Sequence, residues 1–322
     1  MSTIRFDNVS KQFPNSSRPA VDDVDFVVEE GTFVVLLGPS GCGKTTLLKM
    51  INRLYEPTSG TIFLGDEDIR QMDATRLRRQ IGYVIQQIGL FPHMTVAQNV
   101  AIVPELLHWE EERIAARIDE LLTLVDLPPD EYRDRYPSQM SGGQRQRVGV
   151  ARALAGDPGV ILMDEPFGAI DAITRGGLQD ELLRLQRKLH KTIVFVTHDV
   201  EEALRLADKI VIMRDGRIVQ YDTPFNILSQ PASQFVRDLI GADDIVRQLS
   251  LIRVETAMEP LPADYVPNGR PTVRCDDSLR QALSVLLGSA APALTVLDTD
   301  RPVGLLTLAG IQNSAAENEH IA

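Results

Sequence analysis

The sequence predicts an α/β fold with a mixed sheet, and three observations support this class. Residues 4–9 and 23–28 alternate between apolar and polar side chains, which is the pattern of strands with one buried face. The segments 32–38, 159–167 and 192–199 contain nearly continuous apolar runs, which are typical of strands buried on both faces. Amphipathic helical patterns separate these runs, so the strands and helices are expected to form one layered core.

The remaining elements follow in chain order. The pattern predicts a helix in 41–54, a turn at 56–60, a strand in 61–69, a mainly helical segment over about 95–156, helices in 179–190 and 201–208, and a β-hairpin in 209–222. The hairpin turn is expected at Asp215-Gly216, a dipeptide that suits tight turns. The core is therefore expected to be interrupted by a helical subdomain.

The composition changes after about residue 241. A proline-rich stretch at 257–271 precedes a short helix, two strands and the start of a helix, so the pattern indicates a small α/β unit. A unit of this size is small for an independent core, and we expect it to pair with a second copy or to pack on another surface. The predicted division is 1–240 for the main domain, 241–250 for a linker, 251–315 for the small unit and 316–322 for a tail.

Composition limits the possible functions. The net charge of −12 argues against a nucleic-acid-binding surface or a polybasic membrane anchor. Cys42 and Cys275 lie far apart without metal-ligand spacing, which favours reduced thiols in the cytoplasm. The N-terminal residues lack the pattern of a signal peptide, and the apolar runs are shorter than the roughly twenty residues of a membrane helix. Any connection to a membrane is expected through a partner.

Residues 38–45, GPSGCGKT, match the phosphate-binding loop pattern G-x-x-x-x-G-K-[ST] between a predicted strand and a predicted helix. Backbone amides of such a loop surround a β-phosphate, and Lys44 is expected to reach the β- and γ-phosphates. The hydroxyl of Thr45 is expected to ligate Mg²⁺.

Polar side chains end three other predicted strands. Asp164 is expected to hold Mg²⁺, and Glu165 to act as the general base that polarises the attacking water. His198 is expected to contact the γ-phosphate and to help hold that water. Gln86 follows the third of these strands and could contact Mg²⁺ or water, although spacing alone does not separate it from Gln87.

A second glycine-rich helix start, SGGQ at 141–144, lies between these motifs. The order GPSGCGKTT, Gln86, SGGQ, ILMDEP and His198 resembles the ATP-binding subunit of an ABC transporter over residues 1 to about 240. That resemblance implies an ABC-type P-loop NTPase core and an ATPase that works as a head-to-tail homodimer with two ATP molecules and Mg²⁺. In such a dimer the SGGQ of one subunit faces the Lys44 loop of the other.

The resemblance also assigns individual residues. It places Phe13 at the position that stacks on adenine, Gln86 in the Q-loop, Asp171 in the D-loop, and His198 as the switch histidine. The predicted catalytic residues are Glu165, His198, Lys44 and Gln86, and the predicted metal ligands are Thr45, Gln86 and Asp164. The predicted nucleotide-binding residues are Phe13, Gly38, Pro39, Ser40, Gly41, Cys42, Gly43, Lys44, Thr45, Thr46, Ser141, Gly142, Gly143, Gln144 and Asp171.

Within that family, segments such as RYPSQMSGGQRQRVGVARAL and QPASQFVRDLIG resemble importers of quaternary-amine osmoprotectants (glycine betaine, choline, carnitine) of enteric bacteria. The small C-terminal unit resembles one cystathionine-β-synthase-type (CBS) repeat, which could sense ionic strength, dimerise or simply pack. The implied partners are permease subunits and, indirectly, a periplasmic or lipid-anchored binding protein, and the implied location is the cytoplasmic face of the bacterial inner membrane. Phe91, Met94 and Val96 are expected to form an exposed apolar docking patch for the permease, although burial within the helical subdomain would account equally well for any single one of them.

Two alternative functions remain open at this stage. The chain could serve an ABC importer for another small solute, because the permease and the binding protein choose the cargo. It could also be a non-transport ABC-type mechanical ATPase of DNA repair or translation. The absence of long coiled-coil insertions and of a second ATPase half, together with the net negative charge, disfavours the mechanical ATPase.

Overall fold

The computed structural model describes residues 3–14, 16–85, 89–168, 170–241, 244–262, 265, 269–289 and 291–319. The chain divides into two compact units, Met1–Tyr221 and Asp222–Ala322, which we describe separately. The predicted domain boundary at residue 240 stays a prediction, because compactness and domain function are different criteria. Within the described ranges, no helix combines the length and the apolar character that spanning a membrane requires.

The first unit contains an antiparallel sheet of four strands in the order β2-β1-β4-β5. Its strands are β1 (Ile4–Lys11), β2 (Val21–Val28), β4 (Ser59–Leu64) and β5 (Glu67–Asp68). Ile4, Phe6 and Val9 of β1 are fully buried while Arg5 is exposed, so β1 has the predicted one-sided pattern.

A second sheet has six strands in the order β10-β9-β3-β8-β7-β6. Its strands are β3 (Phe33–Leu37), β6 (Ile81–Val84), β7 (Val160–Asp164), β8 (Thr192–Thr197), β9 (Lys209–Arg214) and β10 (Arg217–Asp222). All neighbours from β9 to β6 are parallel, and β3, β7 and β8 are buried along their whole length. The predicted hairpin is present, since Asp215 and Gly216 both have positive φ between β9 and β10.

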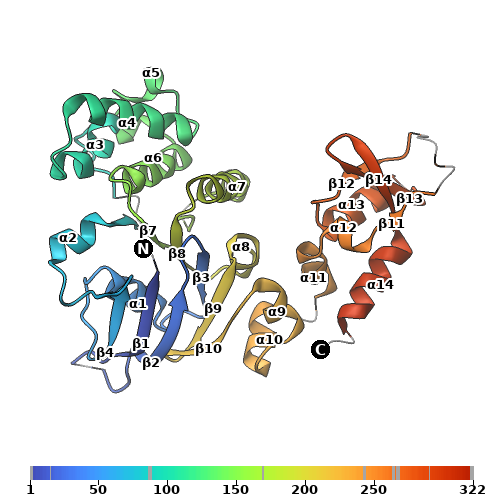
Figure 1. Cartoon of the computed structure of the whole chain (residues 1–322), viewed down its shortest axis with the longest axis horizontal. Coiled ribbons are helices and arrows are strands. Elements are labelled where there is room, and N and C mark those ends of the chain that lie inside the picture. Colours follow the sequence, from blue (N-terminus) through green and yellow to red (C-terminus); the bar gives the residue numbers. More distant parts are fainter. Residues whose placement is uncertain are drawn as a thin grey trace. The chain divides into compact units, whose positions relative to one another are not determined.

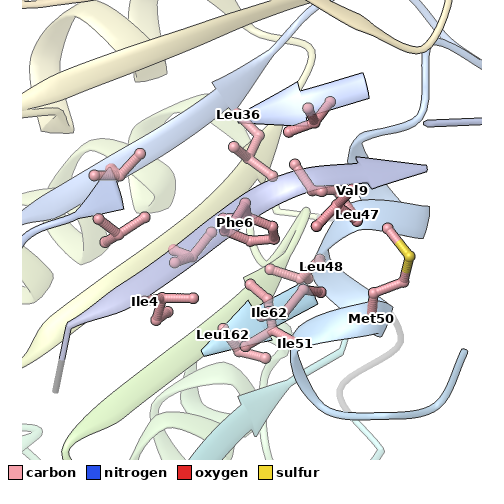
Figure 2. Close-up of a cluster of buried hydrophobic side chains, with 14 of the residues drawn as sticks. Ile4, Phe6, Val9, Leu36, Leu47, Leu48, Met50, Ile51, Ile62 and Leu162 are labelled. Carbon is pink, nitrogen blue, oxygen red and sulfur yellow. The ribbon is translucent and has the colours of Figure 1, made fainter. Parts of the chain in front are cut away.

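The main hydrophobic core lies between these two sheets, with helix α1 (Lys44–Ile51) inside it. Figure 2 shows Phe6 of β1 and Leu162 of β7 in the same cluster as Leu47 and Leu48 of α1. Packing on both sides fixes α1 and therefore fixes the loop that leads into it.

The segment predicted to be helical contains α3 (Val96–Leu106), α4 (Glu111–Leu124), α5 (Pro129–Tyr132), a 3₁₀ turn (Pro137–Gln139) and α6 (Gly142–Leu154). These helices pack on one another, and α6 also contacts β6 and α7 (Ala172–Leu189) (Figure 1). Helices α2 (Ala74–Arg79) and α8 (Val200–Leu206) complete the unit. Val96 is fully buried and Met94 half-buried, whereas Phe91 is exposed, so Val96 follows the alternative of burial and is not part of an exposed patch.

The second unit has its own sheet, in the order β11-β14-β13-β12. Its strands are β11 (Glu259–Pro260), β12 (Thr272–Arg274), β13 (Ala293–Asp298) and β14 (Arg301–Thr307). Its helices are α9 (Pro224–Ser229), α10 (Gln234–Ile240), α11 (Ile245–Leu251), α12 (Val254–Ala257), α13 (Leu279–Ser289) and α14 (Leu308–Glu319). A separate hydrophobic cluster around Leu279, Leu294 and Leu306 joins α11–α14 to this sheet. Helix α11 occupies much of the predicted linker, and α14 covers the first residues of the predicted tail.

Candidate nucleotide-binding site

Three adjacent strands deliver the predicted functional residues to one edge of the six-stranded sheet. Strand β8 lies between β3 and β7, with Leu37 opposite Thr197 and Val196 opposite Asp164. Because the strands are parallel, the segments after their carboxyl ends meet at the same edge, where α/β sheets bind ligands. The loop 38–43, Glu165 and His198 therefore gather there.

The loop after β3 requires glycine at two positions. Gly38 has φ 153°, and a Cβ on it would lie 2.3 Å from the carbonyl oxygen of Met213. Gly43 has φ 110°, and a Cβ there would lie 2.3 Å from the carbonyl oxygen of Ala20. Both contacts are with backbone atoms, so neither position accepts a side chain without displacing β9 or the start of β2.

Lys44 is buried, and its ammonium group is held by the loop itself. Nζ donates to the carbonyl oxygens of Gly38 at 2.7 Å and Pro39 at 3.0 Å, and lies 3.7 Å from Sγ of Cys42. Burial raises the pKa of the Cys42 thiol although the nearby Lys44 opposes this effect. A phosphate bound by the loop would therefore meet a positioned ammonium group next to an uncharged thiol.

The N-terminus of α1 has no described side-chain cap, in contrast to the starts of α6 and α7. Ser141 caps α6 and Asp171 caps α7. Uncapped amides at a helix start are available to an anion, and the helix dipole adds to the attraction. Pro39, Ser40 and Gly41 are exposed, and Thr46 is half-buried in the first turn of α1.

Thr45 and Asp164 form the second part of the site. The Thr45 hydroxyl donates to Oδ1 of Asp164 at 2.9 Å, so the two oxygen atoms predicted to bind Mg²⁺ lie next to each other. Burial raises the pKa of Asp164, while the hydrogen bond from Thr45 opposes the shift. Within the described part of the chain no cluster of three or more acidic, His or Cys side chains could hold a metal, but Mg²⁺ needs only one or two protein oxygens when phosphates and waters supply the rest. The pair therefore fits Mg²⁺.

Glu165 and His198 form the third part of the site. Nδ1 of His198 lies 3.2 Å from Oε1 of Glu165, and the imidazole is exposed. Glu165 has φ 44°, a left-handed conformation that is uncommon for glutamate. Its amide donates to the carbonyl oxygen of Val196 at 3.0 Å, which ties this conformation to β8.

The SGGQ segment lies at the start of α6. The Ser141 hydroxyl accepts from the Gln144 amide at 3.2 Å, and Oε1 of Gln144 accepts from the Ser141 amide at 2.9 Å. The two hydrogen bonds of this capping box do not involve the first amides of α6, those of Gly142 and Gly143. A Cβ on Gly143 would lie 2.8 Å from Cγ2 of Thr174, so α6 and α7 approach each other closely here.

The structure treats the three remaining predicted residues differently: it describes the surroundings of Asp171 and Phe13 but not of Gln86. Asp171 caps α7, accepting from the Thr174 amide at 3.0 Å. Phe13 is half-buried, with Tyr55 edge-on at 5.3 Å and Nζ of Lys11 5.3 Å from its ring centre, and no described hydrogen bond or ring contact joins it to the phosphate loop. Gln86 lies outside the described residues.

Sequence reasoning missed several residues next to the site. Tyr83 on β6 is one of them. Burial and the charge of the nearby Asp164 raise the pKa of its hydroxyl to about 12. Thr197 and Asp199 flank His198, and Asp199 caps α8. The sequence signal for Asp199 was present, because an Asp followed by Glu residues before an apolar helix is typical of an N-terminus.

The fold and these three groups of side chains define a nucleotide-binding P-loop protein. A family model described as ABC transporter matches residues 21–168. The chain is 50% identical to the carnitine transport ATP-binding protein OpuCA of Listeria monocytogenes, over 92% of this chain and 72% of that protein. It is 46% identical to the osmoprotectant import ATP-binding protein OsmV of Salmonella typhimurium, over 97% of this chain and 81% of that protein.

A solved dimeric structure of the ATP-binding cassette MJ0796, in a post-hydrolysis state bound to ADP and Pi, matches with a TM-score of 0.62 and 33% identity. The match covers 69% of this chain and 98% of that one. The chain therefore belongs to the ABC transporter family of ATP-binding proteins. The predicted resemblance and the predicted ATPase class are confirmed by these matches.

Proposed function

We propose that the chain binds and hydrolyses ATP to drive an importer of quaternary-amine osmoprotectants such as glycine betaine, choline and carnitine. The arrangement of Thr45 with Asp164 and of Glu165 with His198, on neighbouring strand ends beside the Lys44 loop, carries the ATPase part of the proposal. The similarity to a carnitine transport protein and to an osmoprotectant import protein supports the cargo class.

Each group of side chains has a role in the proposed hydrolysis. Lys44 and the amides of residues 38–43 bind the phosphates, and Thr45 with Asp164 would hold Mg²⁺, which neutralises phosphate charge when bound. Glu165 accepts a proton from the attacking water, and His198 keeps Glu165 oriented and contacts the γ-phosphate. We retain Gln86 as a further oxygen ligand and Phe13 as the adenine-stacking residue.

We propose a head-to-tail homodimer in which Ser141, Gly142, Gly143 and Gln144 of one subunit complete the site of the other. The exposed Ser141 supports this arrangement, because a hydroxyl that accepts from Gln144 still has its proton to donate. Asp171, at the start of α7, would lie at the same interface.

A groove of about 380 Å³ is proposed as the docking site of a cytoplasmic helix of the permease. Ile85, Phe91 and Val103 supply apolar surface there, and Arg152 bonds the carbonyl oxygen of Gly89 at 2.7 Å. Through this contact the chain would lie on the cytoplasmic face of the inner membrane, with a substrate-binding protein as an indirect partner.

The C-terminal unit is proposed to be a CBS-like regulatory or dimerising module. Its parallel β12–β13 pair and antiparallel β13–β14 pair, covered by α13 and α14, support that proposal. Nucleotide-binding CBS repeats often carry an aspartate that holds ribose at the position of Gly310. A Cβ there would lie 3.0 Å from the carbonyl oxygen of Ala257, so an aspartate does not fit without a shift.

Glu165→Gln tests the catalytic assignment. The variant keeps the shape of the side chain but cannot accept a proton, so hydrolysis should slow by at least about a hundredfold while ATP stays bound. Light scattering with ATP and Mg²⁺ should then show a stable dimer, whereas Lys44→Ala should stay monomeric. A Glu165→Gln chain that hydrolyses ATP at the wild-type rate would overturn the assignment.

Uptake tests the cargo separately. Cells that carry the chain with its permease should accumulate labelled glycine betaine, choline or carnitine, and Lys44→Ala should abolish this uptake. Normal ATPase activity without uptake of any of the three would overturn the cargo class only.

A further inference from the structure

Arg175 of α7 contacts two segments of the site that are far apart in sequence. Its Nη2 donates to the carbonyl oxygen of Ile170 at 3.1 Å, directly before Asp171. Its Nη1 lies 3.3 Å from Oδ2 of Asp199, directly after His198. One guanidinium group therefore bridges the segment of Asp171 and the turn of His198.

The turn of His198 is held on both sides. Thr197 Oγ1 donates to Oε2 of Glu202 at 2.6 Å and accepts from the Asp199 amide at 3.0 Å. Oδ1 of Asp199 accepts from the amides of Glu201 at 2.9 Å and Glu202 at 3.3 Å. The backbone of His198 is thus fixed by its neighbours, while its imidazole stays exposed.

Glu202 joins the same contacts from α8. It is buried, accepts from Nε2 of Gln179 at 3.2 Å, and lies 4.0 Å from Nη1 of Arg175. Burial raises its pKa, and the hydrogen bond from Thr197 opposes that shift. These bonds connect α7, α8 and the end of β8 into one polar network.

We propose that Arg175 is a positioning residue for ATP hydrolysis, which sets the His198 turn and the backbone before Asp171 relative to each other. The proposal rests on the roles proposed above for His198 and Asp171. A guanidinium group has donors in a fixed planar fork, so it bonds a carbonyl oxygen and a carboxylate at once. Lysine carries its donors on a single atom and lacks this planar fork.

Two matched pairs of variants test the role of Arg175, each pair setting a change in its contacts against a control. Asp199→Asn removes the charge pair with Arg175 but keeps a good helix cap, so the fold should survive. Asp180→Asn removes a similar pair, between Asp180 and Arg205 at 2.7 Å, that also joins α7 to α8 but contacts neither Ile170 nor His198's turn. Arg175→Lys and Arg175→Ala form the second pair.

ATPase rates of the full chain, per folded molecule, measure the effect. We expect kcat to fall by about tenfold or more in Arg175→Ala and by about threefold or more in Asp199→Asn, with KM for ATP changed by less than about threefold. Asp180→Asn should stay within about twofold of wild type, and Arg175→Lys should recover only part of the loss.

A double-mutant cycle separates positioning from general stability. If Arg175 acts through His198, then Arg175→Ala should lower kcat by less than about twofold in a His198→Ala background. Multiplicative losses both in this background and in an Asp171→Asn background, or a wild-type kcat in both Arg175→Ala and Asp199→Asn, overturn this proposal alone. A wild-type rate in His198→Ala by itself instead overturns the proposed role of His198, and the positioning proposal with it.

Discussion

Replacing Glu181 by glutamine is expected to remove about 2 kcal/mol of the pH dependence of stability in this chain. Glu181 lies on α7 and is only 5% exposed, among apolar side chains that include Phe167 and Leu178. Its Oε2 lies 3.1 Å from Nη2 of Arg147 on α6. Burial raises the pKa of Glu181 from 4.5 to about 7, although Arg147 opposes the shift.

The direction and the size of the pH effect on the free energy of unfolding follow from the pKa of Glu181. The folded state binds the proton of Glu181 more tightly than the unfolded state, so the contribution is fully present below about pH 4.5 and is lost as the pH rises through about 7. At about 1.4 kcal/mol for each pH unit between the two values, the complete loss is about 3 kcal/mol. Between about pH 5 and about pH 7.5 it amounts to about 2 kcal/mol.

Urea unfolding at several pH values measures this effect. The free energy of unfolding of wild type should fall relative to that of Glu181→Gln by about 2 kcal/mol over this range. Other buried acids such as Asp164 and Glu202 titrate in both proteins and cancel in the difference. Glu120→Gln, at an exposed glutamate on α4, should follow the wild-type curve. Parallel curves for wild type and Glu181→Gln would refute the reasoning.

Three further outcomes follow from the structure. Gly38→Ala should weaken ATP binding by about tenfold or more in a titration with a fluorescent nucleotide, because the new Cβ would lie 2.3 Å from the Met213 carbonyl oxygen; unchanged affinity would contradict that crowding. Thr95→Ala should lower the free energy of unfolding by about 1 kcal/mol, because α3 loses its capping box; an unchanged urea midpoint would count against it. Leu294→Ala should destabilise the C-terminal unit by about 2–5 kcal/mol, measured by hydrogen exchange, and unaltered protection of β13 would exclude a tightly packed core there.

Local sequence patterns predicted the parts of the fold that local chemistry determines. The apolar runs of β3 and β8 became buried strands because both faces of the sheet are covered. The turn at Asp215-Gly216 formed because both residues tolerate positive φ. The phosphate loop was predictable for a similar reason, since Gly38 and Gly43 both have positive φ, but their close approach to the carbonyl oxygens of Met213 and Ala20 was not.

Features that depend on distant partners were not predictable in this way. The bond from Arg175 to Asp199 joins α7 to a turn beyond β8, and no short pattern encodes it. Val96 was expected to be exposed, but its amide donates to the carbonyl oxygen of Arg135 and its side chain is buried at the start of α3. An apolar residue near a helix start does not reveal which surface will cover it.

The two glycine-rich helix starts of this chain turn out to be chemically different. The start of α1 has no described side-chain cap and lies at the sheet edge beside Lys44, so it suits phosphates bound by the same subunit. The start of α6 is already capped by the exposed Ser141, and α6 packs on α3, α4, α7 and β6, whereas α1 packs on β7 and β8. The two starts thus belong to different parts of the fold, and in the proposed dimer the amides of Gly142 and Gly143 would receive a phosphate brought by another molecule. A second copy of the chain, with ATP already bound at its own Lys44 loop, meets that requirement.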